Sequence, residues 1–351
     1  MLKKLFAKIF ASKRPAGEVD FTDLESILIN PSGAGIGDAI VLTCAIRQLR
    51  ETYPTAKIGV IYHVRNKEVF NNSPLKIELV KQSIFYAAAH RNEWQLFLDC
   101  SPRFTTKGIL FSFLLNFKYV MCFEKEKKKY YNTNSIKNYN QYIAGLENIH
   151  LSKFLFLTCL KKYIKDDASH YVLPPIAETD EAKILKFIKK DKCNIMVCPF
   201  GTTRELDNRE FKAFFQEVLA GNENKFHLMF PNDERSAQYL LEDSKITQTI
   251  LPRLTLFQWF ALISKADLVV AVDSASVHVA SAYKKPLVAF YGGKQAFTQF
   301  APLSYAHSIT IVPKHAMPKN FNGTMSGYDH KDTVAKIKKL ITTLPMFQKL
   351  T

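Results

Sequence analysis

Residues 266–282 read Ala-Asp-Leu-Val-Val-Ala-Val-Asp-Ser-Ala-Ser-Val-His-Val-Ala-Ser-Ala, and the architecture of the chain can be worked out from them. The unbroken apolar run Leu268–Val272 is rich in β-branched residues and predicts a strand buried on both faces. Asp273 closes this strand, and the small and apolar residues from Val277 onward predict a helix. The two intervening serines are favourable helix N-caps, which leave free backbone N–H groups at the sheet edge. A strand end followed by a helix N-terminus is a natural anion site.

The alternation of strand and helix continues on both sides of this stretch. Lys285-Pro286 breaks the helix, and residues 287–291 form a second apolar run before a Gly-Gly turn. Near the other end of the chain, residues 26–30 and 58–62 predict strands that flank a helix at 39–51. Such a βαβ unit forces parallel pairing with a right-handed crossover. We therefore expect an α/β protein with two doubly wound, Rossmann-like domains.

Size and composition are consistent with this architecture. The 351 residues suffice for two domains, and 47% hydrophobic residues are typical of a globular protein. Six cysteines are scattered through apolar surroundings without a Cys-x-x-Cys pair, which favours buried free thiols in a reducing compartment over a zinc site.

The formal charge of +16 requires an anionic partner or another explanation. Nucleic acid is the default for so basic a protein, but no zinc-finger spacing or RNA-binding aromatic signature is present. An anionic membrane or a phosphorylated lipid acceptor fits the charge equally well. The N-terminal segment places five apolar residues on one helical stripe with lysines opposite: Leu2, Leu5, Phe6, Ile9 and Phe10. It is too short and charged to span a bilayer, so it either lies among lipid headgroups or packs on the body of the protein.

A glycine-rich loop, residues 31–38, follows the first predicted strand. Gly33-x-Gly35 begins a dinucleotide fingerprint, but Asp38 stands where the third glycine would fall, and no acidic residue ends the second strand. A nicotinamide site is therefore not expected. Asp38 is either a carboxylate placed for chemistry at a helix N-terminus or a helix cap.

Three loops of the second half follow predicted strands, at the edge where open α/β sheets bind ligands. They are Gly201-Thr202-Thr203, Asp233-Glu234 and the loop that opens with Asp273-Ser274. Hydroxyls and free amides suit a diphosphate, whereas an acidic loop suits sugar or ribose hydroxyls. His278, one turn into the last helix, is either a ligand contact or a packed helical histidine.

These motifs together resemble the bacterial heptosyltransferases, the ADP-heptose:lipopolysaccharide family of GT-B enzymes (glycosyltransferase family 9). Gly35-Ile36-Gly37-Asp38 looks like the family's N-terminal motif, in which the aspartate is the proposed catalytic base. Thr202-Thr203-Arg204 is similar to its phosphate-binding threonine pair. The family's Asp-Thr-Gly-x-x-His falls on four residues: Asp273, Ser274, Ala275 and His278.

The resemblance implies two Rossmann-like domains facing across a cleft. We expect an acceptor-binding domain at 1–172, with a basic amphipathic segment at 1–15, and a donor-binding domain at 173–328. A helix at 329–351 is expected to pack back on the first domain. The resemblance also implies that Asp38 is the catalytic base and that the donor meets Thr202, Thr203, Arg204, Glu234, Asp273, Ser274, Ala275 and His278. The acceptor side would include Gly35, Gly37, Lys127 and Lys128.

The implied function is an inverting transfer of heptose from ADP-heptose to the inner core of a lipopolysaccharide or lipooligosaccharide. No Asp-x-Asp occurs in the chain, so we expect metal-independent chemistry without a cofactor. From the basic charge and the lipid-linked acceptor we expect the protein to work at the cytoplasmic face of the inner membrane. Partners would be the nucleotide-sugar, a lipid-linked anionic saccharide and the membrane surface, without nucleic acid. Alternatives are another nucleotide-sugar donor for cell-surface polysaccharide, or a non-catalytic nucleotide- or polyanion-binding protein.

Two positions depart from the family pattern. The family's lysine after the threonine pair falls near Asp207, and its usual glycine is Ala275. Arg204, Arg209 or Lys294 could supply the missing positive charge. We therefore expect the donor phosphates to be held by a different set of contacts.

Overall fold

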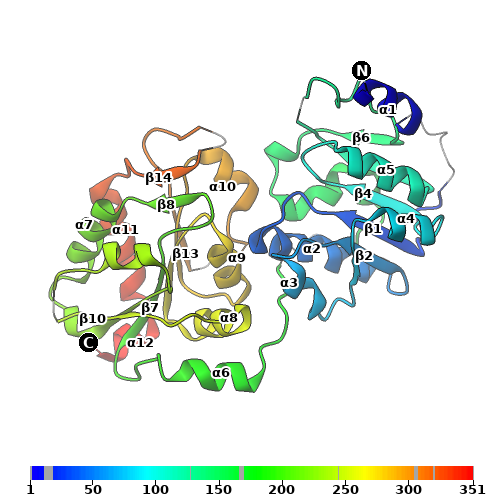
Figure 1. Ribbon diagram of the computed structural model, residues 1–351. Helices are drawn as coiled ribbons and strands as arrows, with labels where there is room; N and C mark the ends of the chain where they lie inside the picture. The colour runs from blue at the N-terminus through cyan, green and yellow to red at the C-terminus, as the bar shows by residue number, and fades with distance from the viewer. Residues whose placement is uncertain are drawn as a thin grey trace. The chain divides into compact units, whose positions relative to one another are not determined.

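The computed structural model of the protein describes residues 2–11, 19–126, 128–165, 170–243, 245–303, 307–318 and 321–350. The chain divides into two compact units, Met1–Pro174 and Pro175–Thr351. Within the described ranges each unit contains a six-stranded parallel sheet flanked by helices (Figure 1). The α/β class predicted from the sequence is thus confirmed.

The sheet of the first unit has the order β3-β2-β1-β4-β5-β6. Its strands are β1 (Ser26–Asn30), β2 (Lys57–Ile61), β3 (Glu78–Val80), β4 (Leu96–Asp99), β5 (Tyr119–Phe123) and β6 (Gln141–Ile143). Its helices after the N-terminal one are α2 (Ile36–Thr52), α3 (Lys67–Asn71), α4 (Ile84–Ala89) and α5 (Thr106–Leu115). The steps from β1 to β2 and from β4 to β5 run in opposite directions along the sheet. Right-handed crossovers therefore place α2 and α5 on opposite faces.

Three strands of this sheet were not predicted. β3 and β6 have only three residues each. Lysines flank β5, so the sequence of 118–129 predicts either a solvated loop or a basic rim that meets phosphates, rather than a strand. The apolar spacing of residues 151–165 also predicts an amphipathic helix, and this prediction is wrong. The chain there forms two 3₁₀ segments, Leu151–Leu157 and Cys159–Lys162, because Thr158 ends one and caps the other through a hydrogen bond from Leu160 N–H.

The N-terminal helix α1 (Leu2–Phe10) packs on the body of the protein, which is one of the two interpretations of this segment. It contacts α5, with Ala7 buried and the rings of Phe10 and Phe113 5.1 Å apart. The same helix leaves apolar side chains in solvent: Leu2 is 83%, Leu5 56% and Ile9 52% exposed. The predicted apolar stripe is therefore split between a packed side and a free side.

The sheet of the second unit has the order β10-β9-β7-β11-β12-β13. Its strands are β7 (Cys193–Cys198), β9 (Phe226–Phe230), β10 (Thr247–Ile250), β11 (Leu268–Val272), β12 (Leu287–Phe290) and β13 (Ser308–Ile311). A separate two-stranded sheet pairs β8 (Arg204–Leu206) with β14 (Gly323–Met325). The helices before the C-terminal pair are α6 (Glu178–Leu185), α7 (Asn208–Leu219), α8 (Leu256–Lys265), α9 (Ala275–Ala282) and α10 (Lys294–Phe300). β11 is the stretch from which the architecture was inferred.

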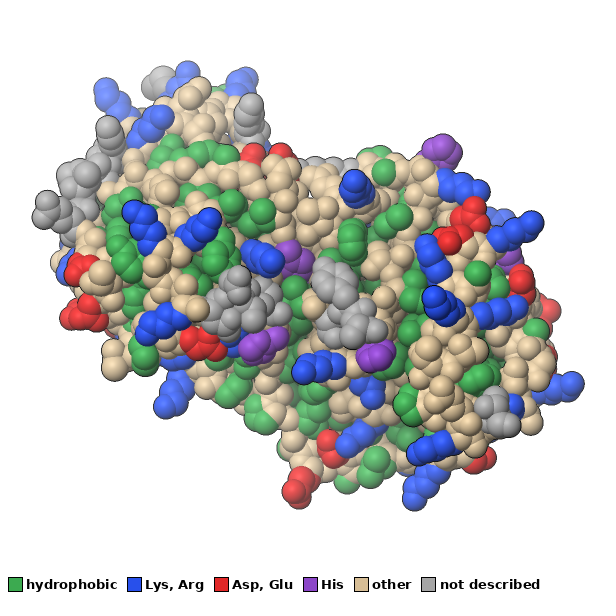
Figure 2. Space-filling model, turned by 180° about the vertical axis from the view of Figure 1, so that it is seen from behind, with side chains coloured by type: hydrophobic (Ala, Val, Ile, Leu, Met, Phe, Trp, Pro, Cys, Tyr) green, Lys and Arg blue, Asp and Glu red, His purple; other side chains and the backbone are tan. Residues whose placement is uncertain are grey.

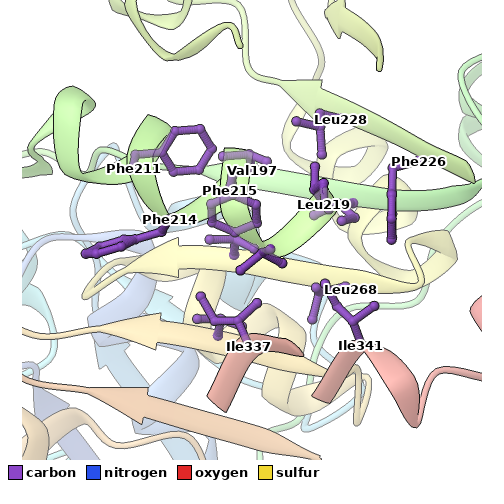
Figure 3. Close-up of a cluster of buried hydrophobic side chains, with 14 of the residues drawn as sticks. Val197, Phe211, Phe214, Phe215, Leu219, Phe226, Leu228, Leu268, Ile337 and Ile341 are labelled. Carbon is purple, nitrogen blue, oxygen red and sulfur yellow. The ribbon is translucent and has the colours of Figure 1, made fainter. Parts of the chain in front are cut away.

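The core of this unit is formed by the helices that cover one face of the sheet. Three phenylalanines of α7 point toward strand residues such as Val197 and Leu268 (Figure 3). Helix α11 (His330–Thr342) buries Ile337 and Ile341 in the same cluster (Figure 3).

The C-terminal helices correct one expectation. Residues 329–351 were expected to pack back on the first domain, whereas α11 buries its apolar face in the core of the second unit. Pro345 does not end the helical region either: it opens a further short helix, α12 (Pro345–Leu350), as proline often does at a first helical position. Phe347 of α12 stacks on Phe226 with ring centroids 5.4 Å apart, which ties this end of the chain to β9.

The surface reflects the high net charge. Figure 2 shows Lys and Arg side chains spread across the viewed face rather than gathered in one patch. On this face the charge of +16 thus does not by itself define a binding surface. None of the helices in the described ranges has the length and apolar character needed to cross a membrane.

Candidate functional site

Asp38 lies in the first turn of α2, immediately after the glycine-rich loop. Its Oδ2 accepts a hydrogen bond from the Gly35 N–H at 3.0 Å, so it caps the helix. The loop fits closely around this carboxylate, because a Cβ at Gly33 would lie 2.1 Å from Asp38 Oδ2. Glycine at position 33 therefore makes room for the aspartate side chain.

The same carboxylate borders a small cavity of about 20 Å³. Its walls are mainly apolar and come from α2, from Cys100 beyond β4, and from the 3₁₀ region: Val41, Leu42, Leu146, Leu151 and Phe154. Burial in these surroundings raises the pKa of Asp38 above its ordinary value, and the Gly35 hydrogen bond opposes the shift. A carboxylate with a raised pKa at a cavity is suited to accept a proton. Asp38 is thus both a helix cap and a candidate base.

The other residues expected on the acceptor side differ in their placement. Gly35 is the N-cap of α2 and Gly37 lies in its first turn. Lys127 lies outside the described residues. Lys128 is on the surface, with a side chain 51% exposed and its Nζ 3.2 Å from Glu126.

The sequence predicts that the basic cluster at 125–129 meets the membrane surface, and for Lys125 this prediction is wrong. Its side chain is 1% exposed, and its Nζ bonds to Asp99 Oδ2 at 2.9 Å and to the Asp99 carbonyl at 2.8 Å. The apparent run of surface charge thus includes one internal ion pair.

In the second unit, Asp273 stands at the carboxyl end of β11 and pairs with Arg204 of β8. The Asp273 side chain is 8% exposed and the Arg204 side chain 21%. Thr202 and Thr203 are exposed in the preceding loop. Ala275 opens α9, and Ser274 is its N-cap. The buried Ser274 Oγ has no hydrogen-bond partner among the residues that the structure describes.

Of the three basic residues proposed to replace the missing lysine, two line one cavity and the third lies elsewhere on the surface. Asp207 at that position caps α7, with its Oδ1 accepting the backbone N–H groups of Arg209 and Glu210 at 2.9 and 3.1 Å. The Arg209 side chain is 90% exposed. Arg204 and Lys294 instead line one cavity.

That cavity has a volume of about 400 Å³, within the range typical of small-molecule sites. It is formed by the Gly292-Gly293 turn after β12, by α10 and by residues 316–318 and Phe321. A Cβ on Gly293 would lie 3.2 Å from Ala316 Cβ, so glycine keeps these segments close. The segment around Met317 was not singled out from the sequence, whereas the Gly-Gly turn, Arg204 and Lys294 were.

Of the expected donor residues, Arg204 lines this cavity, and His278 and Glu234 do not. His278 is buried in α9, 2% exposed, with its ring 6.2 Å from that of Phe300, a residue of the cavity wall. Glu234 is exposed, at the start of a 3₁₀ segment.

Next to Glu234, Asp233 holds the Arg235 guanidinium through hydrogen bonds of 2.9 Å from Nε and Nη2. Arg235 also lies over the Phe200 ring at 4.1 Å. Sequence reasoning missed Arg235, which neutralises much of the acidic character expected of this loop. No group of three or more His, Cys, Asp and Glu side chains placed to hold a metal ion occurs in the described ranges.

Comparison with known proteins identifies the group to which this architecture belongs. The sequence pattern of glycosyltransferase family 9 (heptosyltransferase) matches residues 135–326, more than half of the chain. The chain belongs to glycosyltransferase family 9, so it belongs to a family of glycosyltransferases, as the resemblance implied.

One similar curated protein comes from Escherichia coli strain K12 and carries the provisional name lipopolysaccharide heptosyltransferase 4. The two are 25% identical over 296 residues, which cover 81% of this chain and 79% of the relative.

Solved structures support the same fold. A family 9 glycosyl transferase from Veillonella parvula superposes with a TM-score of 0.68 at 15% identity, over 93% of this chain and 99% of that one. The Escherichia coli ADP-heptose lipopolysaccharide heptosyltransferase II gives 0.64 at 13% identity, over 93% and 100%. An Escherichia coli heptosyltransferase solved with ADP gives 0.59 at 13%, over 90% and 99%. The GT-B class is thereby confirmed.

Proposed function

We propose that this protein transfers heptose from ADP-heptose to the inner core of a lipopolysaccharide or lipooligosaccharide, with inversion at the anomeric carbon. The observation that carries the proposal is Asp38, a carboxylate whose pKa is raised by burial and which borders a cavity. The name of the curated relative supports the acceptor class, and the heptosyltransferase solved with ADP supports the nucleotide.

In this mechanism Asp38 accepts the proton of an acceptor hydroxyl as its oxygen attacks the anomeric carbon of the donor. The new C–O bond forms on the face opposite the diphosphate. The old C–O bond breaks with its electron pair going to the phosphate oxygen, so ADP departs and the configuration inverts. The apolar wall beside Asp38 favours proton uptake, because it disfavours the ionised carboxylate.

The departing diphosphate needs compensating positive charge. Arg204 and Lys294 both border the cavity of about 400 Å³ in the second unit and can supply this charge. The N-terminal amides of α9 and the buried Ser274 Oγ lie at the end of β11 and offer further donors. Thr202 and Thr203 are exposed and free to approach a phosphate as the donor binds. These contacts would compensate for Asp207 and Ala275.

A transfer assay with Asp38→Asn tests the proposal. The purified full-length protein is incubated with ADP-heptose and a deacylated inner-core saccharide, and the product is followed by mass spectrometry. We expect wild-type transfer to fall about 10²-fold or more in the variant, because loss of a general base costs about that much. Full activity of the variant would refute the role of Asp38.

A donor panel separates the proposed sugar from its alternatives. ADP-, UDP-, GDP- and CMP-sugars are compared at equal concentration with the same acceptor. Selective use of ADP-heptose supports the proposal. Selective use of another nucleotide-sugar would keep the transferase and overturn the donor.

We also propose that the protein works at the cytoplasmic face of the inner membrane, where a lipid-linked acceptor would be met. Helix α1 supports this proposal, because Leu2, Leu5 and Ile9 project into solvent from a helix that also carries Lys3, Lys4 and Lys8. Apolar and cationic side chains on one exposed helix match an anionic lipid surface. The sequence predicts that Lys13 and Arg14 belong to the same basic group, and both lie outside the described residues.

A further inference from the structure

The first unit contains a second and larger cavity that the transfer chemistry described above does not use. It has a volume of about 140 Å³ and lies between α5 and the carboxyl-end half of β4 and β5. Figure 1 shows α5 lying over the strands of this unit. A cavity of about 150 Å³ accommodates one benzene molecule, so this space takes no more than one ring, and the outer substituents of a sugar ring would have to lie outside it.

Its position relative to Asp38 follows from the alternation of side chains along an extended chain. Asp99 and Ser101 line this cavity, whereas Cys100 between them lines the Asp38 cavity. Successive side chains of a strand point to opposite faces of the sheet. The two cavities therefore lie on opposite faces of the same sheet, at the same edge, one residue apart along the chain.

The walls combine aromatic rings with carboxamides and hydroxyls. Phe97, Phe104 and Tyr139 contribute the apolar surface. Asn138 is 8% exposed and lines the cavity. Gln82 also lines the cavity. Carboxamides such as these can both donate and accept hydrogen bonds, so they suit a polar, hydroxylated ligand.

The charged groups at this cavity are already engaged. The Lys125 ammonium has three donors, which it gives to Asp99 Oδ2, the Asp99 carbonyl and the Ser101 carbonyl at 2.9, 2.8 and 2.5 Å. Asp99 Oδ1 accepts from Asn30 Nδ2 at 2.8 Å. Arg103 at the rim is paired with Glu126 at 2.8 Å. The groups left to bind a ligand are therefore neutral.

We propose that this cavity binds one neutral sugar ring of the acceptor saccharide, a unit other than the one that is glycosylated. Aromatic walls with a few amides and hydroxyls are suited to a hydroxylated ring of this size. That the bound sugar belongs to the acceptor rests on the proposed transferase function, but binding of a sugar in this cavity can be tested without transfer. The face of the sheet that α5 covers, opposite the face with Asp38, would then help to select which saccharide binds as the acceptor.

Binding is tested by NMR on the full-length protein labelled at isoleucine methyl groups. Ile109 lines the cavity and reports on it, whereas Ile27 is a buried strand residue outside the cavity. Heptose, mannose, glucose and galactose are titrated separately, with glucuronate as an anionic ring of similar size. We expect a saturable shift at Ile109 with at least one neutral sugar and a weaker response to glucuronate.

Three variants make the test specific. Asn138→Leu keeps the branched shape of the side chain, adds some volume and removes the amide, and we expect affinity to fall about tenfold. Gln82→Ala, at a half-buried position that tolerates substitution, is expected to weaken binding by about threefold. Asn134→Leu is the matched control on an exposed position outside the cavity, and it should bind as the wild type does.

The proposal is overturned if no sugar shifts Ile109 up to its solubility limit, if glucuronate binds more tightly than the neutral sugars, or if both cavity variants bind normally. With the acceptor, Asn138→Leu should raise KM about tenfold and leave kcat unchanged. Sugar binding without any transfer would preserve this cavity and remove the transferase function. Transfer that is indifferent to Asn138→Leu and Gln82→Ala would do the reverse.

Discussion

Arg204 of β8 and Asp273 at the end of β11 form an ion pair that joins the two segments of the second unit most closely tied to the expected donor site. Because the Asp273 side chain is only 8% exposed, the pair is shielded from solvent on the carboxylate side. Arg204 thus has two roles, since it also borders the large cavity beside Lys294.

Replacing Arg204 by Met should weaken ADP binding by about tenfold or more, because a cation at the cavity is lost. Calorimetric titration with ADP measures this effect. The free energy of unfolding should also fall by about 1 to 3 kcal/mol, since Asp273 loses its guanidinium partner. Arg209→Met removes an equal charge from a side chain that is 90% exposed, and it should change neither quantity. Wild-type affinity in the Arg204 variant would separate this cavity from the donor.

The raised pKa of Asp38 predicts how the free energy of unfolding depends on pH. Its pKa in the folded protein is raised above the ordinary value of 3.8, so the ionised form is the destabilised one. The stability associated with the protonated form is present below pH 3.8 and is lost as pH rises through the folded pKa. Asp38→Asn lacks this loss, and its amide oxygen can still accept the Gly35 N–H.

The free energies of unfolding of wild type and Asp38→Asn should therefore diverge between about pH 4 and about pH 8, with the variant gaining relative stability. The gain is about 1.4 kcal/mol for each unit by which the folded pKa exceeds the unfolded one. Chemical denaturation at the two pH values checks it. A variant that becomes relatively less stable with rising pH would show that the ionised carboxylate stabilises the fold.

The internal pair of Lys125 and Asp99 predicts a difference between neighbouring lysines. Lys125→Met should cost about 3 kcal/mol or more, because it leaves the Asp99 carboxylate without its ammonium partner. Lys128→Met, at a side chain 51% exposed, should change stability by less than about 0.5 kcal/mol.

Urea unfolding of both lysine variants can be followed in the first unit alone. Trp94 is fully buried there, and a Trp259→Phe background removes the signal of the second unit. Equal midpoints for the two variants would contradict the internal role of Lys125.

Helix α1 predicts salt-sensitive membrane binding. Combined replacement of Lys3, Lys4 and Lys8 by Ala should lower the partition coefficient on anionic vesicles by about 10²-fold, at about 1 kcal/mol per basic residue. Co-sedimentation at increasing salt measures both the loss and its screening.

A matched control for α1 removes three lysines from α11, Lys331, Lys336 and Lys339, and should bind almost as well as the wild type. Strong binding to neutral vesicles would indicate that apolar insertion by Leu2, Leu5 and Ile9 dominates. Equal losses in both triple variants would show that net charge, rather than α1, is responsible.

The parts of the fold that could be predicted are those whose burial is complete. β11 and β12 are apolar along their whole length because helices cover both faces of a parallel sheet. β5 has the same burial, but lysines flank it on both sides and obscured it. The 3₁₀ region from Leu151 has apolar residues that also fit a helical period, and only the side-chain hydrogen bonds of Thr158 interrupt it.

Candidate site residues could be proposed from the sequence where they lie in a short local motif. They could not be proposed where their partners come from distant segments of the chain. Asp38 and Asp273 were proposed as site residues because the short motifs around them resemble those of the family, and their roles stay predictions. The ion pairs of Arg204 and Lys125 depend on residues 69 and 26 positions away, respectively, and no local pattern encodes them. Arg235 and the segment around Met317 were missed for the same reason.

The close fit between Gly33 and Asp38 bears on how glycine-rich loops are interpreted. A missing side chain after the first strand of a Rossmann-like unit is usually taken as space for a phosphate from outside. Here the space is filled from within, by a carboxylate of the next helical turn. A methyl group at position 33 would push that carboxylate out of place without touching any ligand. In such a loop, a glycine can mark the position of a charged side chain of the protein itself rather than that of a bound phosphate.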